Sequence, residues 1–202
     1  MSNDVVLRCE ALTRTYGHGA TEVAALVDAS LEVRAGELVI LRGPSGSGKT
    51  TLLNLLGGLD TPTSGSVWVG DRQVTGASER DLIELRRHEI GYIFQTFALV
   101  SALSAAENVE LPMRLAGVAA AERTERVDEL LAIVGLADHH EQRPNELSGG
   151  QQQRLGIARS LANSPRLIIA DEPTGQLDSL NAEAMMSLIA SLVHDRGVAA
   201  VV

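Results

Sequence analysis

The stretch GPSGSGKT, residues 43–50, decides the fold of this chain. It matches the pattern G-x-x-x-x-G-K-[S/T], and it lies directly after the apolar run 38–41 and before the helical run 51–56. A strand, a glycine-rich loop and a helix in this order mark a phosphate-binding loop, or P-loop. Its glycines let backbone N–H groups surround phosphate oxygens, and the helix N-terminus adds partial positive charge. We expect Lys49 to reach the β- and γ-phosphates of a nucleotide and the Thr50 hydroxyl to bind Mg²⁺.

A second site element is the run Leu167-Ile168-Ile169-Ala170 followed by Asp171 and Glu172. In P-loop enzymes the first acid after such a strand holds Mg²⁺, which makes Asp171 the candidate. Glu172, beside it, is then placed to polarise an attacking water as a general base. An isolated acidic pair is more often a solvated turn or a helix start, but the P-loop favours the catalytic interpretation.

The rest of the chain alternates predicted strands and helices. Residues 104–164 are helical in pattern, with Val127, Leu130, Leu131 and Val134 spaced to form one apolar face. Strands alternating with helices predict an α/β fold with a parallel sheet covered on both faces. Apolar or alternating runs predict strands over 5–11, 23–33, 38–41, 66–69, 90–94, 167–170 and 198–202.

Composition narrows the classes of function. The chain has 202 residues, a formal net charge of −9 and only 2% aromatic residues, which argues against nucleic acid as a partner. Cys9 is the only cysteine, so an internal disulfide and a multi-cysteine metal site are both excluded. No window approaches the roughly 20 apolar residues that a membrane-spanning helix needs.

The stretch Leu147-Ser148-Gly149-Gly150-Gln151, here called the signature segment, allows two interpretations. Ser148 and Gln151 have the spacing of a capping box at the start of a helix, which is a purely structural role. Two consecutive glycines, however, weaken a first helical turn while they expose N–H groups that can bind phosphate. Because one P-loop needs no second cradle, this one would serve a nucleotide held by another molecule.

With these motifs in order, the chain resembles the ATP-binding-cassette (ABC) ATPases over essentially its whole length. The resemblance implies a P-loop NTPase (RecA-like) core with a parallel sheet, an N-terminal antiparallel β subdomain and an inserted α-helical subdomain over about 96–164. All of this would form a single ABC ATPase domain, residues 1–202. It also implies ATP hydrolysis with Mg²⁺, in a head-to-tail homodimer in which the signature segment of one subunit closes on the ATP held by the other.

The resemblance assigns roles to particular residues. Catalysis would use Glu172, Gln95 and Lys49, and Mg²⁺ would be held by Thr50, Gln95 and Asp171. Tyr16 would stack on adenine, unless it is merely a strand-edge aromatic, and Gln95 could instead be a surface amide. Asp178 would reach across the dimer, or only cap a helix. Nucleotide binding would involve Tyr16, Gly43, Pro44, Ser45, Gly46, Ser47, Gly48, Lys49, Thr50, Thr51, Ser148, Gly149, Gly150, Gln151 and Asp178.

Two stretches of the sequence are similar to the ATPases of the lipoprotein-releasing and macrolide-exporter group. These stretches are residues 19–65 and 90–113. This similarity implies an export or extraction ATPase, peripheral on the cytoplasmic face of the bacterial inner membrane, with an integral membrane permease as partner. The permease would dock in a groove near Gln95–Leu111. The predicted groove residues are Phe94, Phe97, Leu99, Val100 and Leu103.

Neither the histidines nor the end of the chain adds to the predicted site. His18, His88, His139, His140 and His194 are expected to be solvated surface residues. The sequence ends inside the strand 198–202, whereas the family continues into a loop whose histidine contacts the γ-phosphate. The resemblance therefore implies a C-terminally short chain that binds ATP but lacks the histidine that helps to hold the attacking water. The alternatives are a regulatory ABC module that binds nucleotide but hydrolyses it weakly, and a soluble ABC protein without a transport role.

Overall fold

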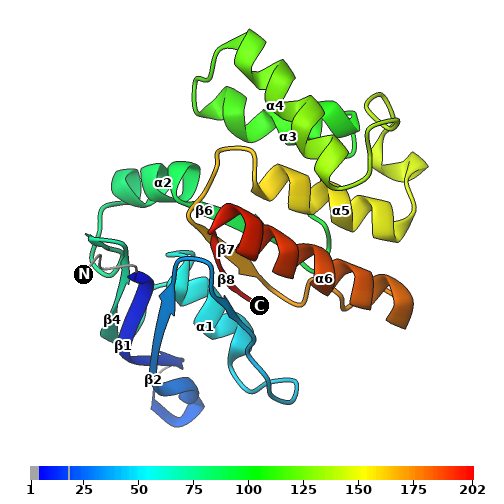
Figure 1. Cartoon of the computed structure of the whole chain (residues 1–202). Helices are drawn as coiled ribbons and strands as arrows, with labels where there is room; N and C mark the ends of the chain where they lie inside the picture. The colour runs from blue at the N-terminus through cyan, green and yellow to red at the C-terminus, as the bar shows by residue number, and fades with distance from the viewer. Residues whose placement is uncertain (1–4, 18) are drawn as a thin grey trace.

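The chain folds around two four-stranded sheets, one antiparallel and one parallel (Figure 1). The computed structural model describes residues 5–17 and 19–202. The antiparallel sheet has the order β2-β1-β4-β5 and the parallel sheet the order β3-β8-β7-β6. The strands are β1 (Val5–Tyr16), β2 (Val23–Arg34), β3 (Leu38–Val39), β4 (Ser64–Val69), β5 (Arg72–Gln73), β6 (Ile90–Ile93), β7 (Leu167–Ala170) and β8 (Ala199–Val201).

Helices cover the parallel sheet and extend to one end of the molecule. In Figure 1, α3, α4 and α5 gather at the top, while β1, β2 and β4 lie at the opposite end. The helices are α1 (Lys49–Leu56), α2 (Glu79–His88), α3 (Ala105–Leu115), α4 (Ala120–Ile133), α5 (Gly149–Ser160) and α6 (Ser179–Arg196), with short 3₁₀ turns at Gly19–Thr21 and Pro144–Glu146.

The parallel sheet separates two hydrophobic cores. Successive residues of a strand point to opposite faces. Leu167 and Ile169 therefore join the core formed with α1 and the antiparallel sheet. Ile168 and Ala170 join the core formed with α3 to α6. All four residues are buried, which explains why β7 reads as a continuous apolar run rather than an alternating one.

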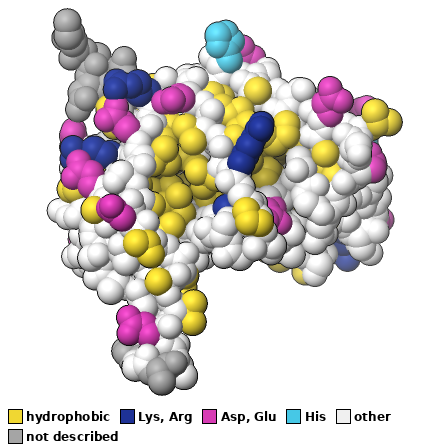
Figure 2. Space-filling model, turned by 90° about the horizontal axis from the view of Figure 1, so that it is seen from below, with side chains coloured by type: hydrophobic (Ala, Val, Ile, Leu, Met, Phe, Trp, Pro, Cys, Tyr) yellow, Lys and Arg dark blue, Asp and Glu magenta, His cyan; other side chains and the backbone are white. Residues whose placement is uncertain are grey.

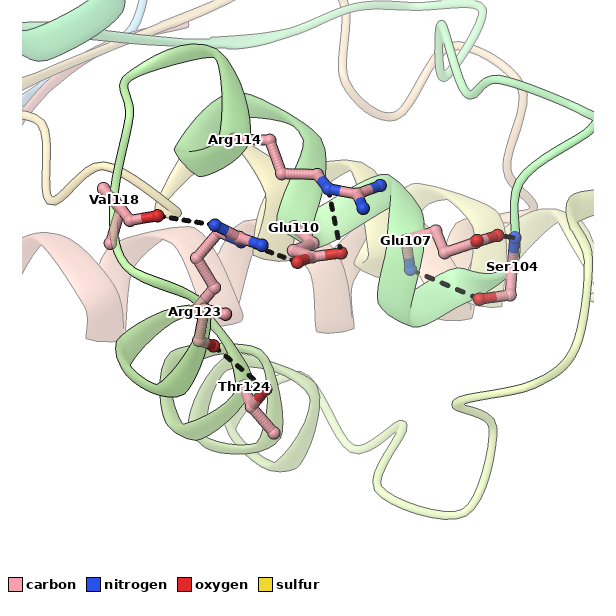
Figure 3. Close-up of polar contacts among 8 residues, drawn as sticks. Ser104, Glu107, Glu110, Arg114, Val118, Arg123 and Thr124 are labelled. Carbon is pink, nitrogen blue, oxygen red and sulfur yellow. Dashed lines mark hydrogen bonds and ion pairs between the residues drawn. The ribbon is translucent and has the colours of Figure 1, made fainter.

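The pairing of α3 with α4 depends on a capping box and on one arginine (Figure 3). Ser104 caps α3 by accepting from the Glu107 N–H, while the Glu107 carboxylate accepts from the Ser104 N–H. From α4, Arg123 donates to the Glu110 carboxylate of α3 at 2.6 Å and to the Val118 carbonyl at 2.6 Å. These contacts fix the short connection between the two helices.

The predicted elements are largely present, with different lengths. The strands expected over 5–11 and 23–33 extend to Tyr16 and Arg34, because the two pair with each other along a long antiparallel ladder. The apolar face predicted at Val127, Leu130, Leu131 and Val134 is buried. The strand expected over 38–41 stops at Val39, although the Leu41 N–H still donates to the Val202 carbonyl at 2.7 Å.

One face of the molecule leaves apolar side chains uncovered. Seen from below, hydrophobic side chains gather in a hollow, acidic side chains lie toward its rim, and a basic side chain lies among the hydrophobic ones (Figure 2). Across residues 5–17 and 19–202, the helices are too short or too polar for any of them to cross a membrane.

Candidate functional site

Two functional loops meet at one edge of the parallel sheet. Gln95 follows β6, and Asp171 and Glu172 follow β7, while Ile93 and Ala170 are register partners in these neighbouring strands. The Asp171 N–H continues the ladder by donating to the Ile93 carbonyl at 3.0 Å. Because the carboxyl ends of parallel strands share an edge, residues that are 76 or 77 positions apart are brought side by side.

The P-loop leads from β3 into α1 and depends on glycine geometry. Gly48 is the N-cap of α1, with φ of 89° in the left-handed region that favours glycine. A Cβ at this position would collide with the Ala25 carbonyl oxygen of β2. The Lys49 ammonium donates to the Gly43 and Pro44 carbonyls at 3.0 and 3.2 Å, so it lies folded over the loop. Lys49 and Thr50 are therefore presented at the helix N-terminus, where an anion is favoured.

Five predicted residues converge at this loop. The Thr50 hydroxyl donates to Asp171 Oδ1 at 3.1 Å, which joins α1 to the end of β7. Gln95 Nε2 donates to Glu172 Oε2 at 3.2 Å, and Lys49 Nζ lies 4.0 Å from Glu172 Oε1. The cluster thus places a hydroxyl, two carboxylates, an amide and an ammonium around one point.

Glu172 has a strained backbone. Its φ is 45°, a left-handed value that costs a non-glycine residue on the order of 1–3 kcal/mol. The Gly175 N–H donates to the Glu172 carbonyl at 3.0 Å, which closes the turn and helps to maintain this conformation. Strained residues of this kind concentrate at functional sites, where the surrounding structure holds them in place.

A pocket of about 500 Å³ opens beside the cluster. Its charged lining consists of Arg42, Lys49, Asp171 and Glu172. Its apolar wall includes Ile40, Leu53, Met186 and Val202. The remaining predicted P-loop residues Ser45 and Ser47 are exposed, and Thr51 is half-buried on the first turn of α1.

Tyr16 lies at the end of β1 and is 41% exposed. Its register partner is Val23 of β2, two residues before the Ala25 that contacts the P-loop. The Tyr16 hydroxyl donates to Asp60 Oδ2 at 2.7 Å, and the Arg14 guanidinium lies over the ring, 4.5 Å from its centroid. The predicted aromatic residue is therefore at the P-loop side of the antiparallel sheet, within a polar cluster.

The signature segment lies at the start of α5, apart from the P-loop cluster. Ser148 and Gln151 form the predicted capping box, in which the Ser148 N–H donates to Gln151 Oε1 at 2.8 Å. Ser148 and Gly149 are exposed. Residues 43–50 and 147–151 are all described, and none of the hydrogen bonds or ion pairs of the structure joins the two ranges. Ser148 therefore caps α5 as the spacing predicted, and the start of this helix lies on the surface.

Asp178 caps α6 and lies on the same side as the signature segment. Its carboxylate accepts from the Asn181 N–H at 3.0 Å, and this hydrogen bond lowers the pKa of the Asp178 carboxyl. A Cβ added to Gly150 would lie 3.2 Å from Asn181 Oδ1. The start of α5 and the start of α6 are thus neighbours, and together they present Ser148, Gly149 and Asp178 on the surface.

Two histidines, His139 and His140, depart from the expected solvated position. His139 is half-buried, and its Nε2 lies 2.8 Å from Gln151 Nε2 of the signature segment. The segment before α5 folds back onto α3, since the Ala106 N–H donates to the His140 carbonyl at 3.0 Å. Sequence periodicity carries no signal for such a loop contact. His88 and His194 are exposed and His140 is half-buried, 3.6 Å from Asp128, while His18 lies outside the described residues.

The structure has a groove beside the segment that was predicted to receive the permease, and this groove contains few of the predicted residues. Of the five, Phe94 lines a groove of about 430 Å³. Phe97, Leu99, Val100 and Leu103 do not line it. The chain turns through left-handed φ values at Phe97 and Ala98, which directs Leu99 against the helical core. The groove lies between α2, β6, α3 and α5 and is lined by Ile83, Arg86, Phe94, Leu111, Leu115 and Arg159 among others.

Arg159 ties this groove to the turn after Gln95. Its guanidinium donates to the Phe97 carbonyl at 2.9 Å and to the Ala98 carbonyl. Burial of the side chain lowers the pKa of Arg159. No sequence pattern singles out Arg159, because its partners are backbone carbonyls about 60 positions earlier.

Comparison with known proteins agrees with this geometry. A family described as ABC transporter matches residues 26–175. The chain is 51% identical over 184 residues to an uncharacterized ABC transporter ATP-binding protein of Thermotoga maritima, covering 91% of this chain and 78% of that protein. It is 48% identical over 186 residues to the macrolide export ATP-binding/permease protein MacB of Salmonella typhimurium, covering 92% of this chain but 28% of that protein.

A solved structure shares the fold. The ATP-binding cassette MJ0796, described as a dimer in a post-hydrolysis state bound to ADP and Pi, superposes with a TM-score of 0.86 at 41% identity. The superposition covers 96% of this chain and 85% of that one. The P-loop NTPase fold predicted from the sequence is thereby confirmed. With its P-loop, its paired acids and its separate signature segment, the chain belongs to the ABC transporter family of ATP-binding proteins.

Proposed function

We propose that this chain binds and hydrolyses ATP as the cassette subunit of a transporter, and that ATP-driven dimerisation powers export or extraction through a membrane permease. The observation that carries the proposal is the division of the site into two separate parts. Lys49, Thr50, Asp171 and Glu172 form one cluster, while the signature segment lies on another surface. A second copy of the chain, turned head to tail, supplies the missing half of each site.

The residues of the cluster fit Mg²⁺ and a nucleoside triphosphate. The Thr50 hydroxyl and the Asp171 carboxylate, in contact at 3.1 Å, offer the oxygen ligands that Mg²⁺ prefers. Within residues 5–17 and 19–202, no group of three or more His, Cys, Asp or Glu side chains could hold a metal ion. This suits an ion that keeps water and phosphate oxygens among its ligands. When bound, Mg²⁺ would supply positive charge that offsets the negative charge of the phosphates.

The chain's own side chains divide the work of hydrolysis. Lys49 exchanges its carbonyl partners for phosphate oxygens, since an ammonium gains more from a charged acceptor than from a neutral one. Glu172 accepts the proton of the attacking water, and Gln95, 3.2 Å from it, orients that carboxylate. Neutralising charge and positioning the water account for most of the catalysis that phosphoryl transfer needs.

The dimer places the start of α5 against the γ-phosphate held by the partner. The N–H groups of Gly149 and Gly150 belong to the first turn of α5, and a helix N-terminus favours an anion. Asp178, at the neighbouring start of α6, lies on the same surface and reaches the second subunit. ATP is then held between two chains, so its hydrolysis weakens the dimer.

The membrane partner docks in the groove between α2, β6, α3 and α5. Ile83, Phe94, Leu111 and Leu115 give the groove an apolar lining, and Phe94 and Leu115 are 37% and 65% exposed. Phe94 directly precedes Gln95, so docking there is next to the catalytic cluster. The subunit would work peripherally on the cytoplasmic face of the bacterial inner membrane, as the resemblance to exporter ATPases implies.

The test is ATP-dependent dimerisation of two variants, measured by analytical ultracentrifugation with MgATP. We expect Glu172→Gln to form a stable dimer, because it keeps the nucleotide site but removes the proton acceptor. Lys49→Ala should remain monomeric, because it loses the phosphate ligand. A Glu172→Gln protein that hydrolyses ATP at the parent rate would contradict the general-base role, and a monomeric one would contradict the dimer.

A further inference from the structure

Tyr16 is held on two sides by charged residues. The Arg14 guanidinium carbon lies 4.5 Å from the centre of the ring, over one of its faces. The hydroxyl at the far end of the ring donates to Asp60 Oδ2 at 2.7 Å. With 41% of the residue exposed, the ring is fixed in place without being covered.

Asp60 closes the cluster by binding Arg14 as well. Arg14 Nε donates to Asp60 Oδ2 at 2.9 Å and its terminal nitrogen to Oδ1 at 2.8 Å, a bidentate pair. Desolvation raises the pKa of the Asp60 carboxyl, whereas hydrogen bonds from Tyr16, the Thr61 N–H and Arg14 lower it. The lowering effects together are larger, so the net shift of the pKa is downward. Both charged side chains are about three-quarters buried, which distinguishes them from a freely solvated surface pair.

The cluster connects the ring to the phosphate-binding helix. The N–H groups of Leu59 and Asp60 donate to the Asn54 carbonyl at 2.8 and 3.3 Å, which anchors Asp60 to the end of α1. The same helix begins at Lys49 of the P-loop. Asp60 therefore links β1, which carries Arg14 and Tyr16, to the end of α1.

We propose that Arg14 and Asp60 are positioning residues for the base of the nucleotide, which hold the Tyr16 ring so that its uncovered surface accepts a purine. The inference rests on the proposed function of the P-loop site. The guanidinium occupies one face of the ring, so the base takes the other. An ordered ring also avoids the cost of immobilising a side chain on binding, about 0.5–1.5 kcal/mol in general.

The chain supplies its own matched control on the same strand. Arg8 of β1 lies 4.3 Å from the centre of the Trp68 ring and forms an ion pair with Glu10 at 3.3 Å. It therefore makes the same kinds of contact as Arg14. Its register partner Trp68 belongs to β4, so the pair does not involve Tyr16.

The experiment is calorimetric titration of the full chain with two ligands, MgATP and magnesium tripolyphosphate, which carries the phosphates without a base. Tyr16→Ala should weaken MgATP on the order of tenfold or more, since a base stacked on an aromatic ring contributes about 1–3 kcal/mol. Arg14→Met should weaken MgATP by about threefold to tenfold. Both variants should bind tripolyphosphate like the parent, and Arg8→Met should bind both ligands like the parent.

A double variant and a milder substitution complete the test. If Arg14 acts through the ring, Arg14→Met added to Tyr16→Ala causes no further loss of MgATP affinity. Tyr16→Phe keeps the ring and removes the bond to Asp60, so it should weaken MgATP by about threefold. This variant tests the inference even where Arg14→Met destabilises the fold, which its melting temperature reports.

Failure of the inference and failure of the proposed function look different. If Arg14→Met and Tyr16→Phe both bind MgATP like the parent while Tyr16→Ala does not, the positioning role is wrong and the adenine site stands. If Arg14→Met weakens both ligands equally, Arg14 acts on the phosphates instead, and the inference is again wrong. If Tyr16→Ala binds MgATP like the parent, the adenine assignment itself is wrong.

Discussion

At the scale of single residues, the site depends on Glu172, whose backbone is strained and whose carboxylate contacts Gln95 and Lys49. Glu172 is held at a φ of 45° while its side chain accepts from Gln95 and lies 4.0 Å from the Lys49 ammonium. Each of these contacts replaces one that water would make in an open loop. In the proposed mechanism these contacts fix the direction of the Glu172 carboxylate before a nucleotide binds, which reduces the reorganisation needed at the moment of reaction.

Cys9 gives a residue-scale prediction. The side chain is 1% exposed, and burial raises the pKa of its thiol to about 11 from 9.0. We expect the folded protein at pH 8 to resist alkylation by iodoacetamide, because the thiolate is the reactive form. The same protein in urea should react fully, as measured by mass spectrometry.

The sign of the pH effect on stability follows from the same shift in pKa. Above pH 9 the unfolded thiol loses its proton while the folded one keeps it, so unfolding is favoured. The contribution of Cys9 to stability is thus present below pH 9 and is lost progressively up to about pH 11. Rapid alkylation of the folded protein at pH 8 would contradict the buried, protonated state.

At the scale of elements, the link between β6 and α3 depends on one buried amide. Asn108 is fully buried, accepts from the Val100 N–H at 2.8 Å and donates to the Val100, Leu103 and Ser104 carbonyls. These bonds tie the segment after Gln95 to the first turn of α3. The loop that carries Gln95 is thereby held from its far end.

We expect Asn108→Ala to destabilise the protein by about 2–3 kcal/mol, because it leaves buried backbone groups without partners. The measurement is urea unfolding followed by circular dichroism. Asn145→Ala, at an exposed asparagine, is the control and should change stability by less than about 0.5 kcal/mol. If the two substitutions cost the same, the amide network contributes nothing specific.

At the scale of the whole molecule, the two surfaces of the proposed dimer can be separated by mutation. In the Glu172→Gln background, Lys49→Ala removes the phosphate ligand, and Ser148→Arg blocks the signature segment. We expect neither variant to dimerise alone with MgATP. Their mixture should dimerise, because the P-loop of one chain meets the intact signature segment of the other. Thr124→Arg, on the exposed side of α4, is the matched control and should dimerise alone.

A different dimer would give a different pattern. If each chain closed its own signature segment on its own nucleotide, mixing the two variants would restore nothing. Sedimentation of the mixture beside each variant separates these arrangements directly.

Local chemistry was sufficient to predict much of this protein. The P-loop glycines, the apolar run of β7 and the capping box at Ser148 are short patterns, whose physical demands are met within a few residues. Their positions and the α/β class were accordingly predicted from the sequence. The lengths of β1 and β2 were not, because those strands are extended by pairing with each other.

Tertiary structure alone decided which distant residues touch. Thr50 meets Asp171 across 121 positions because β7 ends beside the start of α1, and Asp60 reaches Tyr16 and Arg14 because the end of α1 lies against β1. The same holds for His139 at Gln151 and for Arg159 at the turn after Gln95. Periodicity and turn chemistry determine what each segment becomes, whereas strand order and packing determine which segments become neighbours.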